Sequence, residues 1–390
     1  MDLSAALALR PDLVEWRRQL HAHPELAYQE HATAAFVRGR LERLGLRPSP
    51  PLAGGTGLTC LIEGDAEGPT VALRADMDAL PIQEATGADY ASTVPGVAHL
   101  CGHDAHTTML LGAAALLADQ RSERGHVKLL FQPAEEGGAG AARMIEDGAL
   151  DAPAVSAVFG LHVDPNQPVG ALSATAGPAT AASDGLDIEV IGEGGHAARP
   201  HQAIDAVAVA AQVVVAIQQL VSRHTDPLQP LVITLGKIEG GFARNVIAPS
   251  VRLEGTVRSF DPALRERLPA LLERTVAGIT QAFGARHELR YRLGYPSLSN
   301  DAALIPMLAD SVAELLGEGR LAPGGPSMGG EDFAYYAELV PGLMARLGVR
   351  NEARGLVHPL HHPRFDLDEN ALPVGAAVLA GFARRYLATH

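Results

Sequence analysis

The chain has 390 residues, 47% of them hydrophobic and 19% charged, a globular composition with enough apolar material for more than one core. Its formal net charge of −14 argues against nucleic acid and against an anionic membrane surface as partners. Only two cysteines are present, Cys60 and Cys101, which excludes a disulfide framework and favours a reducing, cytoplasmic compartment.

The first half of the chain alternates between helical and β-rich segments. Its start lacks the basic region of a secretory signal peptide, so we expect none. Helices are predicted over 13–20 and 32–44, strands over 70–74, 127–131 and 154–161, and an apolar helix over 107–117. This alternation predicts an α/β domain with a mainly parallel sheet and helices on both faces.

Polar residues follow each of the three predicted strands. Asp76 and Asp78 follow the first, Glu135 and Glu136 the second, and His162 the third. Ligands of open α/β sheets bind beyond the carboxyl ends of the strands, so we expect these side chains to share one site. For His162 alone, a hydrogen-bonded core histidine is the commoner role, and its place at a strand end favours a ligand instead.

Three imidazoles, a thiol and a carboxylate lie within residues 99–106. A Cys-x-His turn, here Cys101 and His103, can point two ligands into one space and suits a divalent transition ion. The alternative is a buried cysteine beside a hydrogen-bonded histidine. Asp104 and His106 are either ligands or partners that orient an imidazole or cap the following helix.

The adjacent carboxylates of Glu135 and Glu136 suit metal-assisted hydrolysis. Adjacent side chains point in different directions, so one can bind a metal ion while the other serves as general base. The alternative is a solvated acidic pair at a helix start, where negative charge is stabilised. Asp78 is expected to accept the second ring N–H of a ligating histidine, or else to cap a helix.

From residue 183 the predicted elements follow a different pattern. Strands are predicted over 187–191, 231–235, 251–260 and 288–293, and helices over 203–221 and 264–283. Strand–helix–strand–strand–helix–strand over about 110 residues is typical of an α+β ferredoxin-like domain. Asp205 and three glutamines interrupt the apolar stretch 203–221, which is therefore predicted as an amphipathic helix and not a membrane span.

Two domains are expected from this change of pattern. Residues 1–182 and 294–390 would form the catalytic, metal-binding domain, and residues 183–293 an inserted lid and dimerisation domain.

Three polar residues of the insertion are candidates for substrate contact. Two glycines precede His196, so the backbone can approach a ligand and the imidazole can donate to a substrate oxyanion. The alternative is a glycine-rich hairpin with an exposed histidine. Asn245 and Arg258 are candidates for holding a carboxylate, although Arg258 on a strand is also compatible with a plain surface residue.

Taken together, the motifs resemble those of the M20 metallopeptidase and amidohydrolase family, in particular its aminoacylase, hippurate hydrolase and auxin-conjugate (IAA-amino acid) hydrolase branch. They occur in the family's order and span residues 21–365. The matching stretches are His21-Ala-His-Pro-Glu25, Leu73-Arg-Ala-Asp-Met-Asp-Ala-Leu80, His99-Leu-Cys-Gly-His-Asp-Ala-His106, Phe131-Gln-Pro-Ala-Glu-Glu-Gly137, Gly194-Gly-His-Ala-Ala198, Asn245-Val-Ile247, Gly255-Thr-Val-Arg258, Glu331-Asp-Phe333 and Leu360-His-His-Pro-Arg-Phe365.

The resemblance implies a binuclear centre with two divalent metal ions per subunit, which would be Zn, Mn, Co or Ni. By the matching positions Cys101 would bridge the ions, and the remaining ligands would be His103, Glu136, His162 and His361. Glu135 would be the general base and Asp78 would orient a ligand. His196 would stabilise the oxyanion, and Asn245 and Arg258 would contact the substrate carboxylate. Such lid residues are often supplied by a partner subunit, so a homodimer, or a tetramer, is expected.

Two positions depart from the family's pattern. His362 stands where Ser or Asn usually follows the last ligand histidine, which leaves a choice between His361 and His362. We favour His361, because the Pro-Arg-Phe that follows fixes the alignment. Gly330 stands where Ser is common, which affects the fit of the substrate more than metal binding.

We therefore expect an enzyme, a metal-dependent amidohydrolase that cleaves N-acyl-L-amino acids into a carboxylic acid and an amino acid. A dipeptidase or carboxypeptidase and an N-carbamoyl amino acid hydrolase are the nearest alternatives. A covalent cysteine hydrolase using Cys101 would instead stay active under exhaustive chelation. A non-catalytic metal-binding interaction protein would tolerate replacement of Glu135.

Overall fold

The computed structural model describes residues 3–390, which divide into two compact units. The first unit comprises the described chain up to Ala179 together with Ser299–Gly325 and Asp332–His390. The second comprises Thr180–Leu298 and Pro326–Glu331, so in sequence it is inserted into the first. The predicted insertion, residues 183–293, lies within the second unit, and its role as a lid and dimerisation domain stays a prediction.

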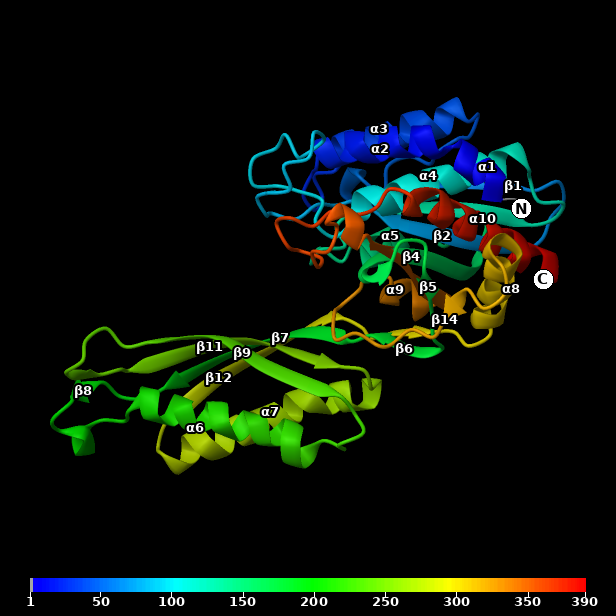
Figure 1. Cartoon of the computed structure of the whole chain (residues 1–390). Helices are drawn as coiled ribbons and strands as arrows, with labels where there is room; N and C mark the ends of the chain where they lie inside the picture. The colour runs from blue at the N-terminus through cyan, green and yellow to red at the C-terminus, as the bar shows by residue number, and fades with distance from the viewer. Residues whose placement is uncertain (1–2) are drawn as a thin grey trace. The chain divides into compact units, whose positions relative to one another are not determined.

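A seven-stranded sheet forms the centre of the first unit (Figure 1). Its strands are β1 (Leu58–Glu63), β2 (Thr70–Asp76), β3 (His126–Gln132), β4 (Val155–Pro168), β5 (Leu172–Ser173), β14 (Leu321–Ala322) and β15 (Gly342–Arg350). They lie in the order β1-β3-β2-β4-β15-β5-β14. Neighbours from β3 to β15 run parallel, whereas β1 and β5 run antiparallel to their partners β3 and β15. The predicted mainly parallel sheet is confirmed.

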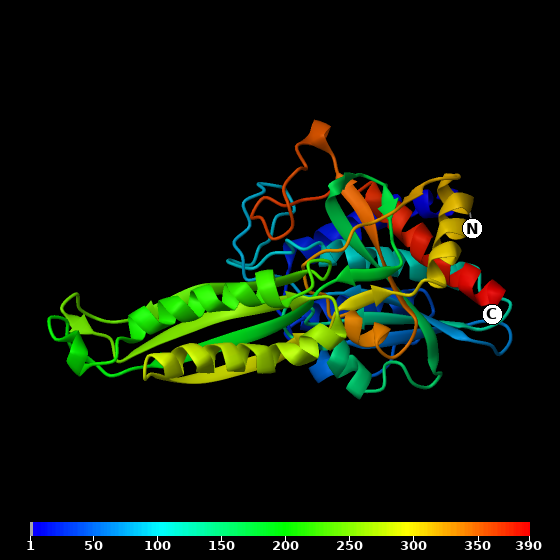
Figure 2. The same ribbon diagram turned by 90° about the horizontal axis from the view of Figure 1, so that it is seen from below.

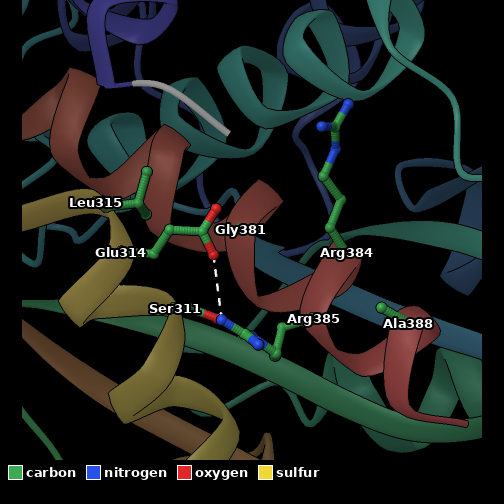
Figure 3. Close-up of a pocket in the computed structure, with 7 residues that line it drawn as sticks. All are labelled: Ser311, Glu314, Leu315, Gly381, Arg384, Arg385 and Ala388. Atoms are coloured by element: carbon green, nitrogen blue, oxygen red, sulfur yellow. Dashed lines mark hydrogen bonds and ion pairs between the residues drawn. The ribbon is translucent and has the colours of Figure 1, made fainter.

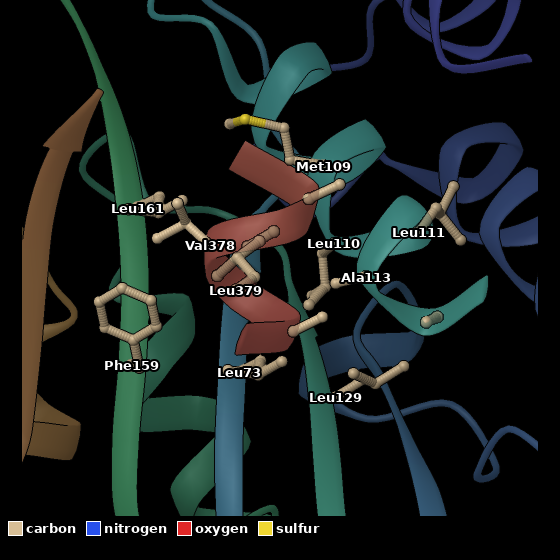
Figure 4. Close-up of a cluster of buried hydrophobic side chains, with 14 of the residues drawn as sticks. Leu73, Met109, Leu110, Leu111, Ala113, Leu129, Phe159, Leu161, Val378 and Leu379 are labelled. Atoms are coloured by element: carbon tan, nitrogen blue, oxygen red, sulfur yellow. The ribbon is translucent and has the colours of Figure 1, made fainter. Parts of the chain in front are cut away.

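Helices pack around this sheet. They are α1 (Leu3–Ala8), α2 (Arg10–Ala22), α3 (His31–Arg43), α4 (His103–Asp119), α5 (Gly140–Glu146), α8 (Leu304–Leu316), α9 (Ala334–Ala337) and α10 (Ala371–Thr389). Strands β2 and β3 are buried at all seven of their positions, as expected for parallel strands covered on both faces. In Figure 4, Leu73, Leu129 and Phe159 from three neighbouring strands lie in one buried cluster with residues of α4 and α10.

The second unit contains a four-stranded antiparallel sheet with the order β12-β7-β11-β9. Its elements are β7 (Ala182–Ile191), β8 (Gly195–His196), α6 (Ala206–Gln219), β9 (Leu231–Gly240), β10 (Val246–Ile247), β11 (Ser250–Ser259), α7 (Pro262–Ala282) and β12 (Arg286–Tyr295). Both α6 and α7 lie over the same face of this sheet (Figures 1 and 2). Burial alternates strictly along β7, because only that face is covered. Apart from the short β8 and β10, the elements follow the predicted strand–helix–strand–strand–helix–strand pattern.

Two further pairs of short strands complete the sheets. β8 pairs with β10, and β6 (Gly177–Thr180) pairs with β13 (Leu298–Asn300). Short 3-10 helices occur at Ala53–Gly55, Pro200–Gln202 and Glu352–Arg354, and a π-helical turn at Leu220–His224.

Among residues 3–390, one helical stretch has the length and composition needed to cross a membrane, Ala206–His224, and 33% of its apolar window is buried. The α6 part of this stretch buries one face in the core of the second unit, through Ala206, Val209, Ala210, Val213 and Ile217.

The core packing predicts the effect of a cavity at Phe159, whose ring is buried and stacks on Phe382 with 4.2 Å between ring centroids. We expect Phe159→Ala to lower the free energy of unfolding by about 3–5 kcal/mol, measured by urea denaturation. The control Leu339→Ala removes a side chain that is 60% exposed and should change stability by less than about 0.5 kcal/mol. Equal losses in the two variants would contradict this packing.

Candidate metal centre

The turn that precedes α4 brings Cys101 and His103 together. Gly102 between them has φ of 88°, and a Cβ at this position would lie 2.4 Å from Cγ2 of Val163, so only glycine fits. The turn ends the preceding loop and starts α4 at His103, four residues before the predicted start at residue 107. Both side chains are buried, and their donor atoms lie within 4.8 Å of each other and of His162.

His162 reaches this space from inside a strand and not from its end. β4 continues to Pro168, six residues beyond His162. The parallel pairing of β2 with β4 ends at Arg74 and Gly160, which places His162 level with Asp76 at the carboxyl end of β2. The site therefore lies at the predicted edge of the sheet, although β4 itself runs past it.

Cys101 belongs to two groups of possible metal ligands. One group contains His103 and His162 and the other contains Glu136 and His361, and the donor atoms within each group lie within 4.8 Å of one another. A thiolate shared by two groups has the placement of a bridging ligand. Sulfur, imidazole and carboxylate donors together suit a divalent transition ion.

Unpartnered donor atoms support the fit of metal ions to these residues. Nε2 of His103 and Oε1 of Glu136 are buried without a hydrogen-bond partner, and Nε2 of His361 lies 3.2 Å from that oxygen. Buried polar atoms are usually hydrogen-bonded, and a bound cation would satisfy both of these atoms. His361 has φ of 64°, a strained conformation for a residue other than glycine, and such strain is concentrated at functional sites.

Hydrogen bonds fix which ring nitrogen of each ligand is free. Nδ1 of His103 donates to the backbone carbonyl of Asp78 at 2.9 Å, and Nδ1 of His162 donates to the carbonyl of Val163 at 2.8 Å. Both rings therefore keep Nε2 available as a metal ligand. Burial also lowers the pKa of His162 well below its usual value, which favours the neutral, ligating form.

His106 and Asp104, two other polar residues of the 99–106 segment, have protein partners. Nε2 of His106 accepts from the N–H of Val163 at 2.9 Å, so its Nδ1 donates to Asp76 at 2.6 Å. Asp104 accepts from Arg17 and contacts Nδ1 of His21, each at 2.8 Å. This geometry favours the role of orienting partners for His106 and Asp104 over that of ligands.

The carboxylate of Asp78 holds the acidic turn and a histidine at once. Its two oxygens accept the N–H groups of Glu135 and Glu136, each at 2.9 Å. Nδ1 of His103 lies 3.3 Å from the same carboxylate. A single buried side chain thus fixes the expected base and two expected ligands relative to one another.

Glu135 follows a strained turn and lies close to the ligands. Ala134 has φ of 55°, and a Cβ at Gly140 would lie 1.7 Å from the carbonyl oxygen of Pro133, so the chain turns sharply here. The carboxylate of Glu135 lies within 4.8 Å of donor atoms of His103 and Glu136. This position allows a carboxylate beside the ligands to exchange a proton with a molecule bound there.

The thiol of Cys101 differs from an activated nucleophile. Burial raises its pKa to about 12, so a thiolate at this position requires a positive charge beside it. A bound metal ion provides such a charge and deprotonates a coordinating thiol.

A buried ionic network behind the site is not evident from motifs alone. The guanidinium of Arg74 donates to Asp76 at 2.8 Å and to Asp332 at 2.9 Å, and Gln132 also donates to both oxygens of Asp332. The N–H of Asp332 in turn donates to Glu135 at 3.4 Å. The sequence signal that could have identified Arg74 is a charged residue inside an otherwise apolar, buried strand.

The three expected substrate-contacting residues lie in the second unit, where only two of them are close together. His196 pairs with Val246 in the β8–β10 ribbon, and the carbonyl of Asn245 accepts the N–H of Ala197 at 3.1 Å. Arg258 instead lies near the far end of β11, opposite Ser183. The eight residues between the two ends of β11 span about 25 Å, so one copy of this unit does not bring Arg258 to His196 and Asn245.

A small cavity elsewhere in the first unit has a different lining. It has a volume of about 200 Å³ between α8 and α10 and is lined by residues that include Ser311, Glu314 and Arg385 (Figure 3). Arg385 pairs with Glu314 at 3.1 Å, and none of the expected site residues lines this cavity.

Comparison with known proteins identifies a family and several similar hydrolases. The sequence model of peptidase family M20/M25/M40 matches residues 72–385 of the chain. The chain is 43% identical over 382 residues to an N-acetyl-L-cysteine deacetylase of Bacillus subtilis, covering 97% of this chain and 89% of that protein. It is 41% identical over 390 residues to the IAA-amino acid hydrolase ILR1-like 4 of Arabidopsis thaliana, covering 98% and 88%.

A solved structure shares the fold. The YXEP protein of Bacillus subtilis, described as a dinuclear metal binding peptidase, superposes with a TM-score of 0.86 at 36% identity, covering 98% of this chain and 99% of that chain.

The contacts of Asp78 generate a prediction about metal affinity. Asp78→Asn leaves one oxygen as an acceptor and places an NH₂ group against the N–H of its second partner, which disturbs the acidic turn. We expect the affinity for Zn²⁺ to fall about 10–100-fold, measured by competition with a chelator. Unchanged affinity would contradict the positioning role of this carboxylate.

Proposed function

The chain belongs to peptidase family M20/M25/M40, and we propose that it is a metal-dependent hydrolase that splits N-acyl-L-amino acids into a carboxylic acid and an amino acid. The observation that carries the proposal is the sharing of Cys101 by two ligand groups beside the carboxylate of Glu135. The relatives named for N-acetyl-L-cysteine and for IAA-amino acids support acyl amino acids as the substrate class. We further propose a cytoplasmic location, consistent with two cysteines that are both free.

The proposed ligands are Cys101 as the bridge, with His103, Glu136, His162 and His361. Two bound divalent ions, whether Zn, Mn, Co or Ni, would polarise the scissile carbonyl and lower the pKa of water toward about 7.

The protein's own residues would perform the proton transfers. Glu135 accepts a proton from the attacking water and returns it to the leaving amine. Asp78 holds the backbone of Glu135 and the ring of His103, so the carboxylate stays in reach during both transfers. His196 would donate to the oxyanion that develops on the substrate carbonyl, and Asn245 and Arg258 would bind the substrate carboxylate.

We propose a homodimer, or a tetramer built from it, in which His196 and Asn245 act on the partner's metal centre. Their separation from Arg258 within one copy supports a second copy as the source of one set. Among the described strands, β9 forms an edge of the sheet and pairs only with β11. It exposes Val232 and Ile238, whereas the opposite edge strand β12 carries charged residues that discourage pairing.

Replacement of the proposed base tests the mechanism. We expect Glu135→Gln to lower kcat by about 10²–10⁴-fold on N-acetyl, benzoyl or indole-acyl amino acids, because proton transfer is lost while the shape is kept. Its metal content, measured on the purified protein, should match that of the unaltered enzyme.

Several outcomes would contradict this mechanism. Unchanged hydrolysis by Glu135→Gln would exclude the assigned base. Activity that survives exhaustive chelation and is lost on thiol alkylation would favour Cys101 as nucleophile. Turnover of dipeptides or N-carbamoyl amino acids in place of acyl amino acids would reassign the substrate class.

Mixing two inactive variants tests the action of lid residues across subunits. His196→Ala should lose about 10²–10³-fold in kcat through loss of an oxyanion donor. Subunit exchange with Glu135→Gln should restore about a quarter of full activity, because half of the dimers then contain one intact site. A monomeric mass in solution with full activity at high dilution would contradict the proposed dimer.

A further inference from the structure

Three consecutive backbone N–H groups of the acidic turn are held by two buried carboxylates. Asp78 accepts from Glu135 and Glu136, and Glu30 accepts from Ala134 at 2.8 Å. Glu30 is fully buried and lies 104 residues away in sequence. The turn that carries the proposed base is therefore clamped from two sides by side chains of different segments.

Glu30 is not used as a helix cap, although it occupies the N-cap position of α3. Its side chain makes no capping hydrogen bond there. The carboxylate of Glu25 instead accepts the N–H groups of Ala32 and Thr33, at 3.0 and 2.8 Å. Because Glu25 satisfies the first turn of α3, the carboxylate of Glu30 is available to reach Ala134.

The residue that Glu30 holds is in a strained conformation. Ala134 has φ of 55°, in the left-handed region that favours glycine. The turn is also crowded, since a Cβ at Gly138 would lie 2.7 Å from Cβ of Ala134. The hydroxyl of Tyr28 donates to the carbonyl of Gly138 at 2.7 Å, so the segment around Glu30 contacts the turn at both ends. Strain of this kind persists only where surrounding contacts enforce it.

We propose that Glu30 is a positioning residue for Glu135, which acts by holding the N–H of Ala134 and so keeping the turn in its left-handed conformation. Loss of this contact releases Ala134 toward ordinary backbone angles and rotates the Glu135 carboxylate away from the ligands. The kinetic part of this inference rests on the proposed function. The conformational part does not, because it concerns the backbone angle alone.

The test combines kinetics with crystal structures of the variants. In Glu30→Ala we expect φ of Ala134 to leave the left-handed region and kcat to fall about tenfold to a hundredfold. KM should stay within about twofold, because substrate binding is not altered. Glu30→Gln keeps an acceptor oxygen and should retain most of the activity.

A second substitution separates positioning from general loosening. Glycine adopts positive φ without a Cβ penalty, so Glu30→Ala combined with Ala134→Gly should recover most of the lost kcat. Glu25→Ala is the matched control, since it removes a neighbouring carboxylate whose two backbone hydrogen bonds go to α3 and not to the acidic turn. It should lower the melting temperature and leave kcat unchanged.

Three results would overturn the inference. These are a left-handed Ala134 with full activity in Glu30→Ala, no recovery in the double variant, or an equal loss of kcat in Glu25→Ala. If the unaltered enzyme hydrolyses no acyl amino acid, the proposed function fails, and the crystal structure of Glu30→Ala still decides the role of Glu30.

Discussion

The carboxylate of Asp78 is the contact on which the geometry of the metal centre depends. It joins the acidic turn after β3 to the start of α4, because its oxygens accept from Glu135 and Glu136 while the ring of His103 lies against it. Asp78, the acidic turn and His103 come from three separate segments of the chain. Protein contacts alone therefore hold the proposed ligands and the proposed base relative to one another, which is what preorganised catalysis requires.

Such a site contains buried charged side chains, and each of them lies beside several partners of opposite charge or hydrogen-bonding partners. Burial alone would raise the pKa of Asp76, but two histidines and the guanidinium of Arg74 outweigh it and hold the pKa well below its usual value. The same guanidinium also pairs with Asp332, which receives further N–H groups from Gln132 and Ala141. Removing one partner from such a network would leave an uncompensated buried charge, which is costlier than the loss of the pair itself. The network behind the site is thus as constrained as the ligands.

Much of the fold could be predicted because many of its helices and strands have a recognisable pattern within their own sequence. The largely apolar sequences of β2 and β3 fit strands that are covered on both faces, and the alternation along β7 fits a strand that is covered on one face. Other elements were missed: no strand was predicted for β1 or β15 and no helix for α10. The positions of these elements depend on neighbours far along the chain. The edge strand β1, for example, pairs antiparallel with β3, whose other neighbour β2 runs parallel to it.

The sequence by itself determined the class of each unit and the donor types of the site, since both follow from periodicity and from motifs within a few residues. Only the tertiary structure decided which histidines keep a free nitrogen. Both ring nitrogens of His106 form hydrogen bonds, with Val163 and Asp76, whereas Nε2 of His103 forms none. It also decided that Glu30 reaches Ala134 across 104 residues. Hydrogen-bond partners of this kind are set by packing between distant segments, so the local sequence pattern does not reveal them.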